Sequence, residues 1–542
     1  MTINIIFFFS VIAVVIIISK IYSAVQRYHA IKKLRQQWGK FTPNPSDLEV
    51  SKLLSQLNKK NDSENYYTLD DDTWNDLDMD EFFKVANRTV TPIGAQCLYD
   101  LLRKPLLNQK EIDVRENIIN TFSKDHALRE KIQIALLPLT RPYVKHLVFS
   151  LWTPLPTKPK YAFLFYCLSI FAVWFLIFTI LGFLHFGFMI VLFVVNSVIV
   201  FLYQNKLRQF LASFQYLAVL INTAGKVSSI IKNDFFDIHN DISKYLKPIK
   251  SVAYNIYSLQ LSEDNPIAAY FNIYFLSQLT GFYSALNKIK INLSGLQKLF
   301  ETIGYLDAMI SVASYRKQFP NFTIPLFSSD PNYFEVNEIF HPLLVDPISN
   351  DFMFESKNIL ITGSNMSGKS TFLKTIGINA ILAQTLNMCT AKKYEAPFLK
   401  IISSIERSDD LMSGKSYYMA EVESILRIIN ASKTYSNHLF IIDEIFRGTN
   451  SVERSAASIE VLKYLMNGKD FTMLATHDLQ LTEILKEKYL NYHFREEMTD
   501  GGLHFDYKLH KGSATSKNAI ALLEFVGYPQ SIVEGAKKLI KD

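Results

Sequence analysis

Residues 359–371, ILITGSNMSGKST, determine the fold of the C-terminal part of this 542-residue chain. The apolar run predicts a buried strand over Ile359–Thr362, and a helix is expected from about Thr371. Between them lies the pattern GxxxxGK followed by Ser, which is a phosphate-binding loop in the strand–loop–helix setting that it requires. Its backbone N–H groups and the helix N-terminus attract phosphate. We therefore expect a nucleotide site made by these residues: Gly363, Ser364, Asn365, Met366, Ser367, Gly368, Lys369, Ser370 and Thr371.

Two side chains of this loop and two later carboxylates have distinct expected roles. Lys369 would neutralise the β- and γ-phosphates, and the Ser370 hydroxyl would ligate Mg²⁺. A second buried strand, Leu439–Ile442, leads into Asp443 and Glu444. We expect Asp443 to hold the Mg²⁺ shell and Glu444 to polarise the attacking water.

A third strand, Thr472–Ala475, is followed by His477. Because this histidine would sit at the same sheet edge as the other two motifs, it can donate a hydrogen bond to a γ-phosphate. A further short β-rich run, Leu399–Ser403, alternates with helical segments, which predicts strand–helix units around a sheet. The expected fold of residues 326–542 is an α/β P-loop NTPase domain.

Residues 413–421, SGKSYYMAE, open a helix expected over Glu421–Ser432. A Ser- and Gly-rich helix start is a natural anion site. Since the phosphate-binding loop already surrounds its own phosphates, this second site could bind the γ-phosphate held by another subunit. The same residues could equally be a plain N-cap.

Four segments together resemble the MutS family of ATPases: residues 362–371 (TGSNMSGKST), 416–421 (SYYMAE), 443–450 (DEIFRGTN) and 475–478 (ATHD). This form of the phosphate-binding loop is much more specific than the generic pattern. Residues 340–344 resemble the family's entry into its ATPase domain, and residues 87–94 resemble the start of its helical core. The tail at 516–530 resembles the C-terminal helices that help pair subunits. The expected fold is therefore a P-loop domain of the ABC and MutS type that follows an all-α core.

The resemblance implies a homodimeric ATPase that uses ATP and Mg²⁺ at composite sites. One chain would supply the loop with Asp443 and the catalytic pair Glu444 and His477. The other chain would supply a signature at its helix start, made of Ser416, Met419 and Glu421. In the family, the ATP state of the dimer is coupled to helical levers and clamps that embrace DNA, so DNA is an expected partner.

The sequence also departs from the family pattern. The core-like stretch begins near residue 75, so there is no room before it for the domain that carries the family's Phe-x-Glu mismatch wedge. The lever and clamp region is expected to be replaced by the apolar run 161–205. Phe446 stands where the family usually has a small residue, and Arg454 where it usually has Gly. We therefore do not expect mismatch recognition from this chain.

The composition excludes two broad classes of protein. Aromatic residues make up 13% of the chain, which excludes wholesale disorder. The three cysteines, Cys97, Cys167 and Cys389, are too few and too scattered for a disulfide scaffold. The formal net charge of +6 is a weak indication of an anionic partner, because basic residues gather beside apolar runs.

Residues 1–19 and 161–205 contain no charged side chain. A membrane helix needs about 20 apolar residues, so we expect three transmembrane helices: an uncleaved anchor in the first run and a hairpin in the second, with its turn near Gly182–Gly187. Lys and Arg flank both runs, which predicts a cytoplasmic location for everything else. The expected location is the cytoplasmic (inner) membrane, multi-pass, with lipid as a partner.

The expected domain plan follows from these runs. Residues 1–23 form the anchor, 24–160 a basic segment and the first part of the helical core, 161–205 the hairpin, 206–325 the second part of the core, and 326–542 the ATPase domain with its dimerisation helices. Within the core we expect helices over Leu207–Lys232 and Phe282–Arg316. The acidic cluster between Asp70 and Glu81 is interpreted as a solvated helix start.

Three functions remain open from the sequence. The first is a membrane-anchored, MutS-like ATPase whose dimer changes act on DNA through a helical lever. The second is a membrane scaffold or signalling protein that is switched by ATP and binds no nucleic acid. The third is a transporter-like ATPase. The segment SYYMAE differs from the signature LSGGQ of transporter ATPases, which argues against this third function.

Overall fold

The computed structural model describes residues 21–22, 24–26, 28–40, 48–59, 67–140, 144–260, 266–319, 321–355, 358–364, 366–405, 417–434, 437–447, 449–466, 470–499, 502–513 and 519–541. The chain forms two compact units. The helical unit comprises segments within 1–62, 87–100 and 118–315, and the sheet unit comprises segments within 63–86, 101–117 and 316–542. The two units are described separately below.

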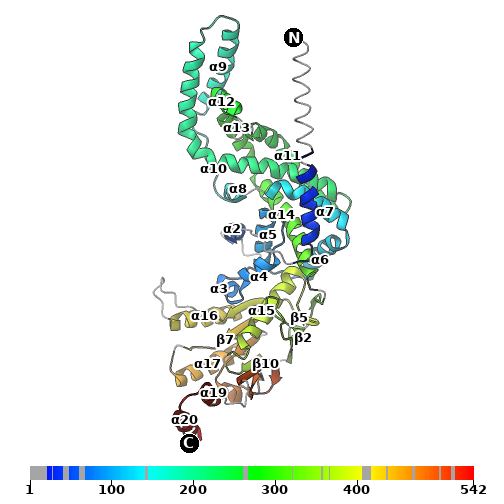
Figure 1. Ribbon diagram of the computed structural model, residues 1–542, viewed down its shortest axis with the longest axis vertical. Helices are drawn as coiled ribbons and strands as arrows, with labels where there is room; N and C mark the ends of the chain where they lie inside the picture. The colour runs from blue at the N-terminus through cyan, green and yellow to red at the C-terminus, as the bar shows by residue number, and fades with distance from the viewer. Residues whose placement is uncertain are drawn as a thin grey trace. The chain divides into compact units, whose positions relative to one another are not determined.

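The helical unit is built from long helices and short connections (Figure 1). Helices α5 and α6 each continue from one unit into the other. The helices that lie wholly or partly in this unit are α2 (Leu48–Lys59), α5 (Pro92–Arg103), α6 (Gln109–Lys124), α7 (His126–Leu136), α8 (Val144–Trp152), α9 (Phe163–Ile180), α10 (Gly187–Ile231), α11 (Phe236–Gln260), α12 (Pro266–Phe275), α13 (Ser277–Ile291) and α14 (Leu293–Arg316).

A buried carboxylate fixes the start of α5 against α14. Asp307 of α14 accepts hydrogen bonds from the backbone N–H of Val90 at 3.0 Å and of Thr91 at 2.8 Å, and from the Thr91 hydroxyl at 2.7 Å. Burial raises the pKa of Asp307 to about 6, although these hydrogen bonds oppose the shift. Gly94 lies directly against this carboxylate, and a Cβ atom there would come within 2.3 Å of Asp307 Oδ2. The stretch at 87–94 therefore has a structural role in this unit.

The apolar run 161–205 forms a helical hairpin, as expected, but the expectation of three transmembrane helices is not met. Among the described residues, only α9 is long and apolar enough to cross a membrane. The second leg, Gly187–Tyr203, is apolar but shorter, because α10 continues without a break into a segment with a polar face. The first run, 1–19, lies outside the described residues. The turn at 181–186 confirms the predicted turn near Gly182–Gly187.

The long helix predicted over Phe282–Arg316 is two helices. α13 ends at Ile291 and α14 begins at Leu293, with Asn292 between them. The Asn292 backbone N–H bonds to the carbonyls of Lys288 and Ile289, and its side-chain amide also donates to Lys288 O at 2.9 Å. Asparagine competes for local backbone bonds in this way, and apolar periodicity alone does not reveal such a break.

The sheet unit holds a six-stranded sheet in the order β10-β9-β4-β8-β7-β6 and a four-stranded sheet in the order β1-β5-β2-β3. β6, β7, β8, β4 and β9 run parallel, and β10 is antiparallel to β9. The strands are β1 (Leu326–Phe327), β2 (Tyr333–Ile339), β3 (Asn350–Glu355), β4 (Asn358–Thr362), β5 (Lys393–Ala396), β6 (Lys400–Ser404), β7 (His438–Asp443), β8 (Phe471–Ala475), β9 (Tyr489–Thr499) and β10 (Gly502–Lys511). The four strands predicted from the sequence match β4, β6, β7 and β8 to within a residue.

The central strands are buried on both faces, which explains their continuous apolar runs. Every residue of β4, β7 and β8 is buried. Phe440 and Ile442 pack in one core with residues of α16 (Tyr417–Ser432) and α17 (Ser451–Leu465). Ile441, which points to the opposite face of β7, lies against Gly377 of α15 (Lys369–Leu386).

Helix α15, which begins in the phosphate-binding loop, is buried along almost its whole length. Its last carbonyls have no partner within the helix and need donors from elsewhere. The Leu106 backbone N–H donates to Gln384 O at 3.0 Å, Arg115 Nη1 to Thr385 O at 2.5 Å, and Arg316 Nη2 to Leu386 O at 2.5 Å. Two guanidinium groups thus lie at the negative end of the helix dipole.

The acidic cluster between Asp70 and Glu81 contains a helix start, but it is not wholly solvated. Asp70 caps α3 (Asp71–Asp76) and accepts a bond from the Thr73 backbone N–H at 2.7 Å. Asp76 is buried, and it accepts bonds from the Ser403 hydroxyl at 2.7 Å and from the Ile405 backbone N–H at 3.0 Å. The interpretation as solvated charge was wrong for Asp76, because its partners on and just after β6 are far away in the sequence.

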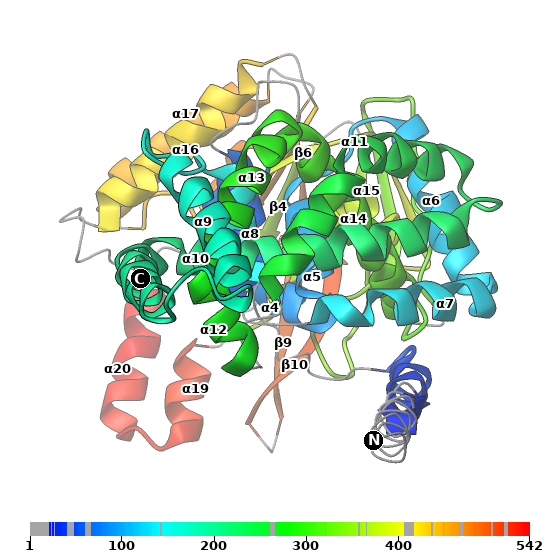
Figure 2. The ribbon, with the colours of Figure 1, turned by 90° about the horizontal axis from the view of Figure 1, so that it is seen from above.

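Two further helices of the sheet unit, α19 (Ala519–Val526) and α20 (Gln530–Lys541), lie side by side (Figure 2).

We predict that Gly94→Ala destabilises the protein. The methyl group would displace the Asp307 carboxylate, and overpacking of this kind costs about 1–3 kcal/mol, whereas the gain in helix propensity is at most about 1 kcal/mol. The midpoint of thermal unfolding of the full-length protein in detergent measures the difference. Gly225→Ala is the matched control, because the nearest atom to a Cβ there is 4.0 Å away. A Gly94→Ala protein as stable as the control variant would contradict the tight contact.

Candidate functional site

The three predicted motifs meet at one edge of the six-stranded sheet. β4, β8 and β7 are neighbouring parallel strands, so their carboxyl ends lie together. The phosphate-binding loop follows β4, the acidic pair Asp443-Glu444 stands at the end of β7, and His477 follows β8. Two backbone bonds tie these ends to one another: Thr476 N–H to Ile361 O and Glu444 N–H to Ala475 O, each at 2.9 Å.

Ser370 and Asp443 lie in direct contact. The Ser370 hydroxyl donates to Asp443 Oδ2, and burial raises the pKa of Asp443 above its ordinary value. Both groups offer the oxygen atoms that Mg²⁺ prefers, and Mg²⁺ usually takes one or two protein ligands and keeps its waters and substrate phosphates. Within the described part of the chain, no group of three or more His, Cys, Asp or Glu side chains is arranged so that it could hold a metal ion. The pair therefore fits Mg²⁺ better than an ion that needs a full set of protein ligands.

Glu444 is held between a histidine and an arginine. His477 Nε2 is 3.0 Å from Glu444 Oε1, and Arg447 Nε is 2.8 Å from Glu444 Oε2. Burial raises the pKa of Glu444, but the His477 hydrogen bond and the charges of Arg447 and Lys369 outweigh it, so the pKa lies below its ordinary value. Glu444 is therefore an ionised, oriented carboxylate at neutral pH.

Lys369 is held inside the loop. Its ammonium donates to the carbonyls of Gly363 at 2.9 Å and Ser364 at 2.7 Å. Burial lowers the pKa of Lys369, and the nearby carboxylates Asp443 and Glu444 partly oppose this shift. A buried, half-desolvated ammonium gains much from an anionic ligand, because the anion replaces the solvation that the lysine has lost.

The two loop glycines have backbone angles that other residues avoid. Gly363 has a φ of +146° and Gly368 a φ of +107°. Space is also short at both positions: a Cβ on Gly363 would lie 2.8 Å from Ser367 Oγ, and one on Gly368 would lie 3.3 Å from Tyr507 Cδ1. These positions explain why the loop pattern requires glycine. Asn365, which we also expect in the nucleotide site, lies outside the described residues.

The segment expected to act on a second subunit is described only in part. Ser416 lies outside the described residues, and α16 begins directly after it, at Tyr417. Met419 is 46% exposed near this helix start. Glu421 is buried, and its carboxylate accepts a bond from the backbone N–H of Arg447 of its own chain at 3.2 Å. Glu421 thus braces the loop after the acidic pair, and the trans role of Ser416 and Met419 stays a prediction.

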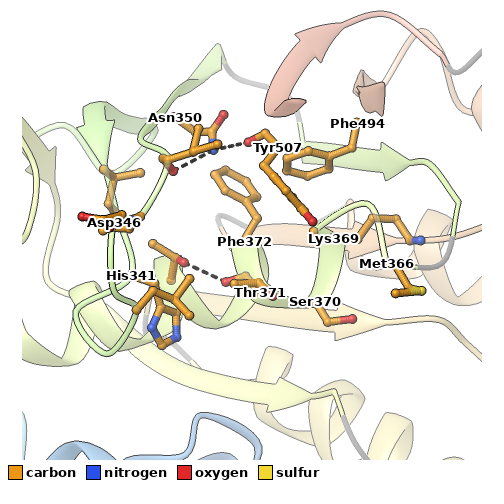
Figure 3. A pocket seen from close by; sticks show the side chains of 16 residues that line it. His341, Asp346, Asn350, Met366, Lys369, Ser370, Thr371, Phe372, Phe494 and Tyr507 are labelled. Carbon is orange, nitrogen blue, oxygen red and sulfur yellow. Dashed lines mark hydrogen bonds between the residues drawn. The ribbon is translucent and has the colours of Figure 1, made fainter. Parts of the chain in front are cut away.

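A pocket of about 420 Å³ opens beside the phosphate-binding loop. Met366 and the start of α15 form one wall, and the loop that precedes β3 forms another. The side chains of Phe372, Phe494 and Tyr507 gather in it (Figure 3). Asn350 joins two of these segments, because its amide donates to Tyr507 O at 3.1 Å and its Oδ1 accepts from the Leu509 N–H at 2.7 Å.

Several residues of the site were not expected from the sequence. Arg447 pairs with Glu444, and the Glu496 carboxylate of β9 accepts a bond from the Ser364 hydroxyl. Asn350, Phe494 and Tyr507 line the pocket. A cation three residues after an acidic pair is a weak signal that could have indicated Arg447. The other residues come from strands whose positions follow only from the tertiary fold.

Phe446 has an unusual backbone conformation. Its φ is +59°, and Glu444, two residues earlier, has a φ of +62°. The Phe446 side chain is buried, belongs to the core under α16 and α17, and lies 6.2 Å from the Tyr418 ring. The left-handed conformation costs roughly 1–2 kcal/mol for a residue with a Cβ. Burial of the ring outweighs this cost, because removing a buried Phe side chain typically costs about 3–5 kcal/mol.

Comparison with known proteins assigns this part of the chain. The profile of MutS domain V matches residues 359–542. The DNA mismatch repair protein MutS of a Thermus thermophilus strain is 33% identical over 194 residues, which are 36% of this chain and 24% of that protein. The MutS proteins of Natronomonas pharaonis and Fusobacterium nucleatum are 28% and 29% identical over 269 and 272 residues, each 48% of this chain and 31% and 30% of those proteins.

Residues 359–542 thus match domain V of the MutS family, and the relatives that align with them are MutS proteins. The match spans less than a third of the length of each of these three relatives. The resemblance inferred from the four motifs is therefore confirmed for the domain that carries the sheet edge described above.

We predict that the two smallest replacements of Phe446 differ in stability. Phe446→Ala loses the buried ring and keeps the strained backbone, whereas Phe446→Gly loses the ring but relieves the strain. Both should unfold at lower temperature than the unchanged protein, and the glycine variant should be the more stable of the two by roughly 1 kcal/mol. Thermal unfolding of the full-length proteins measures the order. A glycine variant at least as stable as the unchanged protein would mean that strain outweighs packing here.

Proposed function

We propose that this chain is a MutS-like ATPase, inserted in a membrane, that binds and hydrolyses ATP with Mg²⁺. One observation carries the proposal: a phosphate-binding loop, a paired Ser370 and Asp443, and an ionised Glu444 held by His477 converge on one sheet edge. These are the parts that phosphoryl transfer needs, namely a phosphate cradle, ligands for the metal and a group that orients water.

The pocket beside the loop would hold the nucleoside. Its volume of about 420 Å³ lies within the usual range of about 300–1,000 Å³ for small-molecule sites. The Phe494 and Tyr507 rings offer flat apolar surface for a base, and the pocket adjoins the Lys369–Thr371 helix start where phosphates would bind. Base and phosphates can therefore be bound at once by adjacent surfaces.

The chain's own groups can then perform the hydrolysis. Backbone N–H groups of the loop and the α15 dipole would bind the phosphates, and Lys369 would exchange its bonds to loop carbonyls for bonds to phosphate oxygens. Ser370 and Asp443 would hold Mg²⁺, which neutralises phosphate charge when bound. Glu444 would orient a water molecule and accept its proton as the water oxygen bonds to the γ-phosphorus and the bond from the γ-phosphorus to the bridging oxygen breaks. His477 and Arg447 keep Glu444 in position.

Dimerisation would complete the site. The start of α16 follows Ser416 and exposes Met419 and Tyr418. An exposed helix start can bind a phosphate held by another copy of the chain, which supports the composite site implied by the family. Glu421 would link the two roles, since it is bonded to Arg447 in its own chain.

The helical hairpin would anchor the chain in the cytoplasmic membrane. Apolar side chains point outward all around α9 and the first part of α10, including Phe171, Trp174 and Phe201. A soluble helix normally has a polar face, whereas lipid is a suitable environment for a helix that is apolar on every side. Lys158 and Lys160 before the hairpin favour the cytoplasmic side for the rest of the chain.

DNA is the partner class that we propose for the helical lever. The relatives found are named DNA mismatch repair proteins, and the ATPase domain is the part that this chain shares with them. An ATP-switched scaffold that binds no nucleic acid is the alternative, and DNA binding separates the two.

We predict that Glu444→Gln abolishes turnover and preserves ATP binding. The amide keeps the shape of the side chain but accepts a proton poorly, and loss of a general base typically slows a reaction about 10²–10⁴-fold. Steady-state phosphate release and equilibrium binding of ATP measure the two effects in the full-length protein. Glu460→Gln is the matched control, because Glu460 is an exposed carboxylate of α17 that pairs with Lys463 one turn later in the same helix. Undiminished turnover in Glu444→Gln would remove Glu444 from the reaction.

We predict that the full-length protein in detergent binds duplex DNA with an affinity that falls steeply with salt. Each neutralised phosphate adds about −0.9 to the slope of log affinity against log salt concentration. Homoduplex and mismatched DNA are titrated side by side, so that any preference for a mismatch is measured directly. Binding titrations at several salt concentrations, with and without ATP, give the result. Absence of binding at low salt in both states would favour the scaffold.

A further inference from the structure

Helix α12 carries aromatic side chains that are largely exposed among the described residues. Tyr270 is 64% exposed and Phe271 is 61% exposed. The chain around it, residues 265–287, contains no Asp, Glu, Lys or Arg. The α13 part of this run is largely buried, whereas in α12 large aromatic side chains of the run lie at the surface.

The position of α12 along the hairpin is set by two contacts. The amide of Asn196, on the second hairpin leg, donates to Tyr274 O at the end of α12 at 2.7 Å. The Phe193 ring of the same leg lies 6.2 Å from the Tyr270 ring. α12 therefore lies beside the second leg of the hairpin (Figure 1).

This position corresponds to membrane depth. The hydroxyls of Tyr161 and Tyr203 bond to each other at 2.9 Å and mark the open end of the hairpin. Asn196 lies about two helical turns, or about 10 Å, beyond that end, and Phe193 lies about 15 Å beyond it. If the bilayer began only past Phe193, the rest of the leg would reach about 10 Å into hydrocarbon that is about 30 Å thick. A hairpin that spans a substantial part of the bilayer therefore places α12 within the bilayer as well.

The hydrogen bond from Asn196 also satisfies a backbone carbonyl at the end of α12 that lipid could not satisfy. The last carbonyls of a helix lack partners within the helix, and an unpaired carbonyl in hydrocarbon is costly. α12 ends at Phe275, where the chain turns with a φ of +49° at Leu276. Asn196 is fully buried in a leg that contains no charged residue, and it donates to one of these carbonyls. The buried Asn196 amide thus holds the end of α12 against the second leg of the hairpin.

We propose that α12 is a membrane-embedded helix that lies beside the hairpin and runs back toward its open end, where the chain continues as α13, with Tyr270 and Phe271 in contact with lipid acyl chains. The proposal rests on the membrane insertion of the hairpin proposed above. It adds a third apolar segment to the membrane-embedded part of the chain, within a region that the sequence assigned to the cytoplasm.

Spin labelling of the full-length protein in phospholipid vesicles tests the proposal. Cys167 is exposed and is first replaced in Cys167→Ser, while Cys97 and Cys389 are buried. Labels are then placed singly through Phe271→Cys on α12, Phe171→Cys on α9 and Val452→Cys on α17, all at exposed positions. Collisions with oxygen, which partitions into lipid, and with a water-soluble nickel chelate report the surroundings of each label.

We expect the Phe271 label to resemble the Phe171 label, with frequent oxygen collisions and loss of most nickel collisions relative to the Val452 label. A Phe171 label in lipid with a Phe271 label in water would overturn the α12 proposal and leave the hairpin intact. Protection of the Phe271 label from both reagents would also overturn it, since protein would then cover α12. Nickel accessibility at both positions would instead remove the membrane hairpin itself, and the α12 proposal with it.

A pair of variants tests the anchor. Asn196→Ala removes the donor to Tyr274 O, so the Phe271 label should become more mobile in its spectrum. Ser197→Ala is the matched control, because the Ser197 hydroxyl bonds to Phe193 O of its own helix at 2.8 Å. An unchanged spectrum in Asn196→Ala would show that α12 is not held by this bond.

Discussion

The buried helix α15 is the element on which the sheet unit depends. Its N-terminus forms the phosphate-binding loop, and its C-terminal carbonyls accept bonds from Leu106, Arg115 and Arg316. A helix with almost no exposed surface cannot satisfy its end groups with water, so its caps must come from other segments. Segments far apart in the sequence are thereby fixed around one helix, and the loop at its other end is held in place. Precise placement of phosphate-binding N–H groups requires such a rigid support.

The sheet edge that carries the three motifs combines this rigidity with local strain and charge. Met366, Glu444 and Phe446 all have positive φ, and each lies in a loop at the carboxyl end of a strand. Strained backbone persists only where the surroundings enforce it, and here buried strands and the Phe446 ring do so. Two opposing effects set the pKa of Glu444: burial raises it, and the nearby His477 and cations lower it. A change in any of these neighbours would alter the charge that the site presents to a phosphate.

Local patterns predicted much of the sheet unit, and long-range contacts account for what they missed. Strands β4, β7 and β8 and the loop between β4 and α15 could be predicted because their signals lie within a dozen residues. The location of Glu444 and His477 at one sheet edge could be predicted because each follows a strand, but their contact with each other could not. Tyr507, Glu496 and the buried Asp76 could not be predicted, because their partners are brought together only by the tertiary fold. Asn292 divides a helix through a local bond that hydrophobic periodicity does not register.

The apolar hairpin and α12 show the same limit of sequence-based prediction in another form. A search for charge-free runs finds 161–205 because it is long, but residues 265–287 are divided between α12 and α13 and give no single span. What identifies them is their place beside Asn196. Helix α10 runs without a break from Gly187 to Ile231, about 65 Å, through both the apolar leg and the core of the helical unit. Because a continuous helix resists bending, a rotation of that core would turn the hairpin and α12 with it. The hairpin, α12 and the packing of the core are therefore mechanically coupled in this unit.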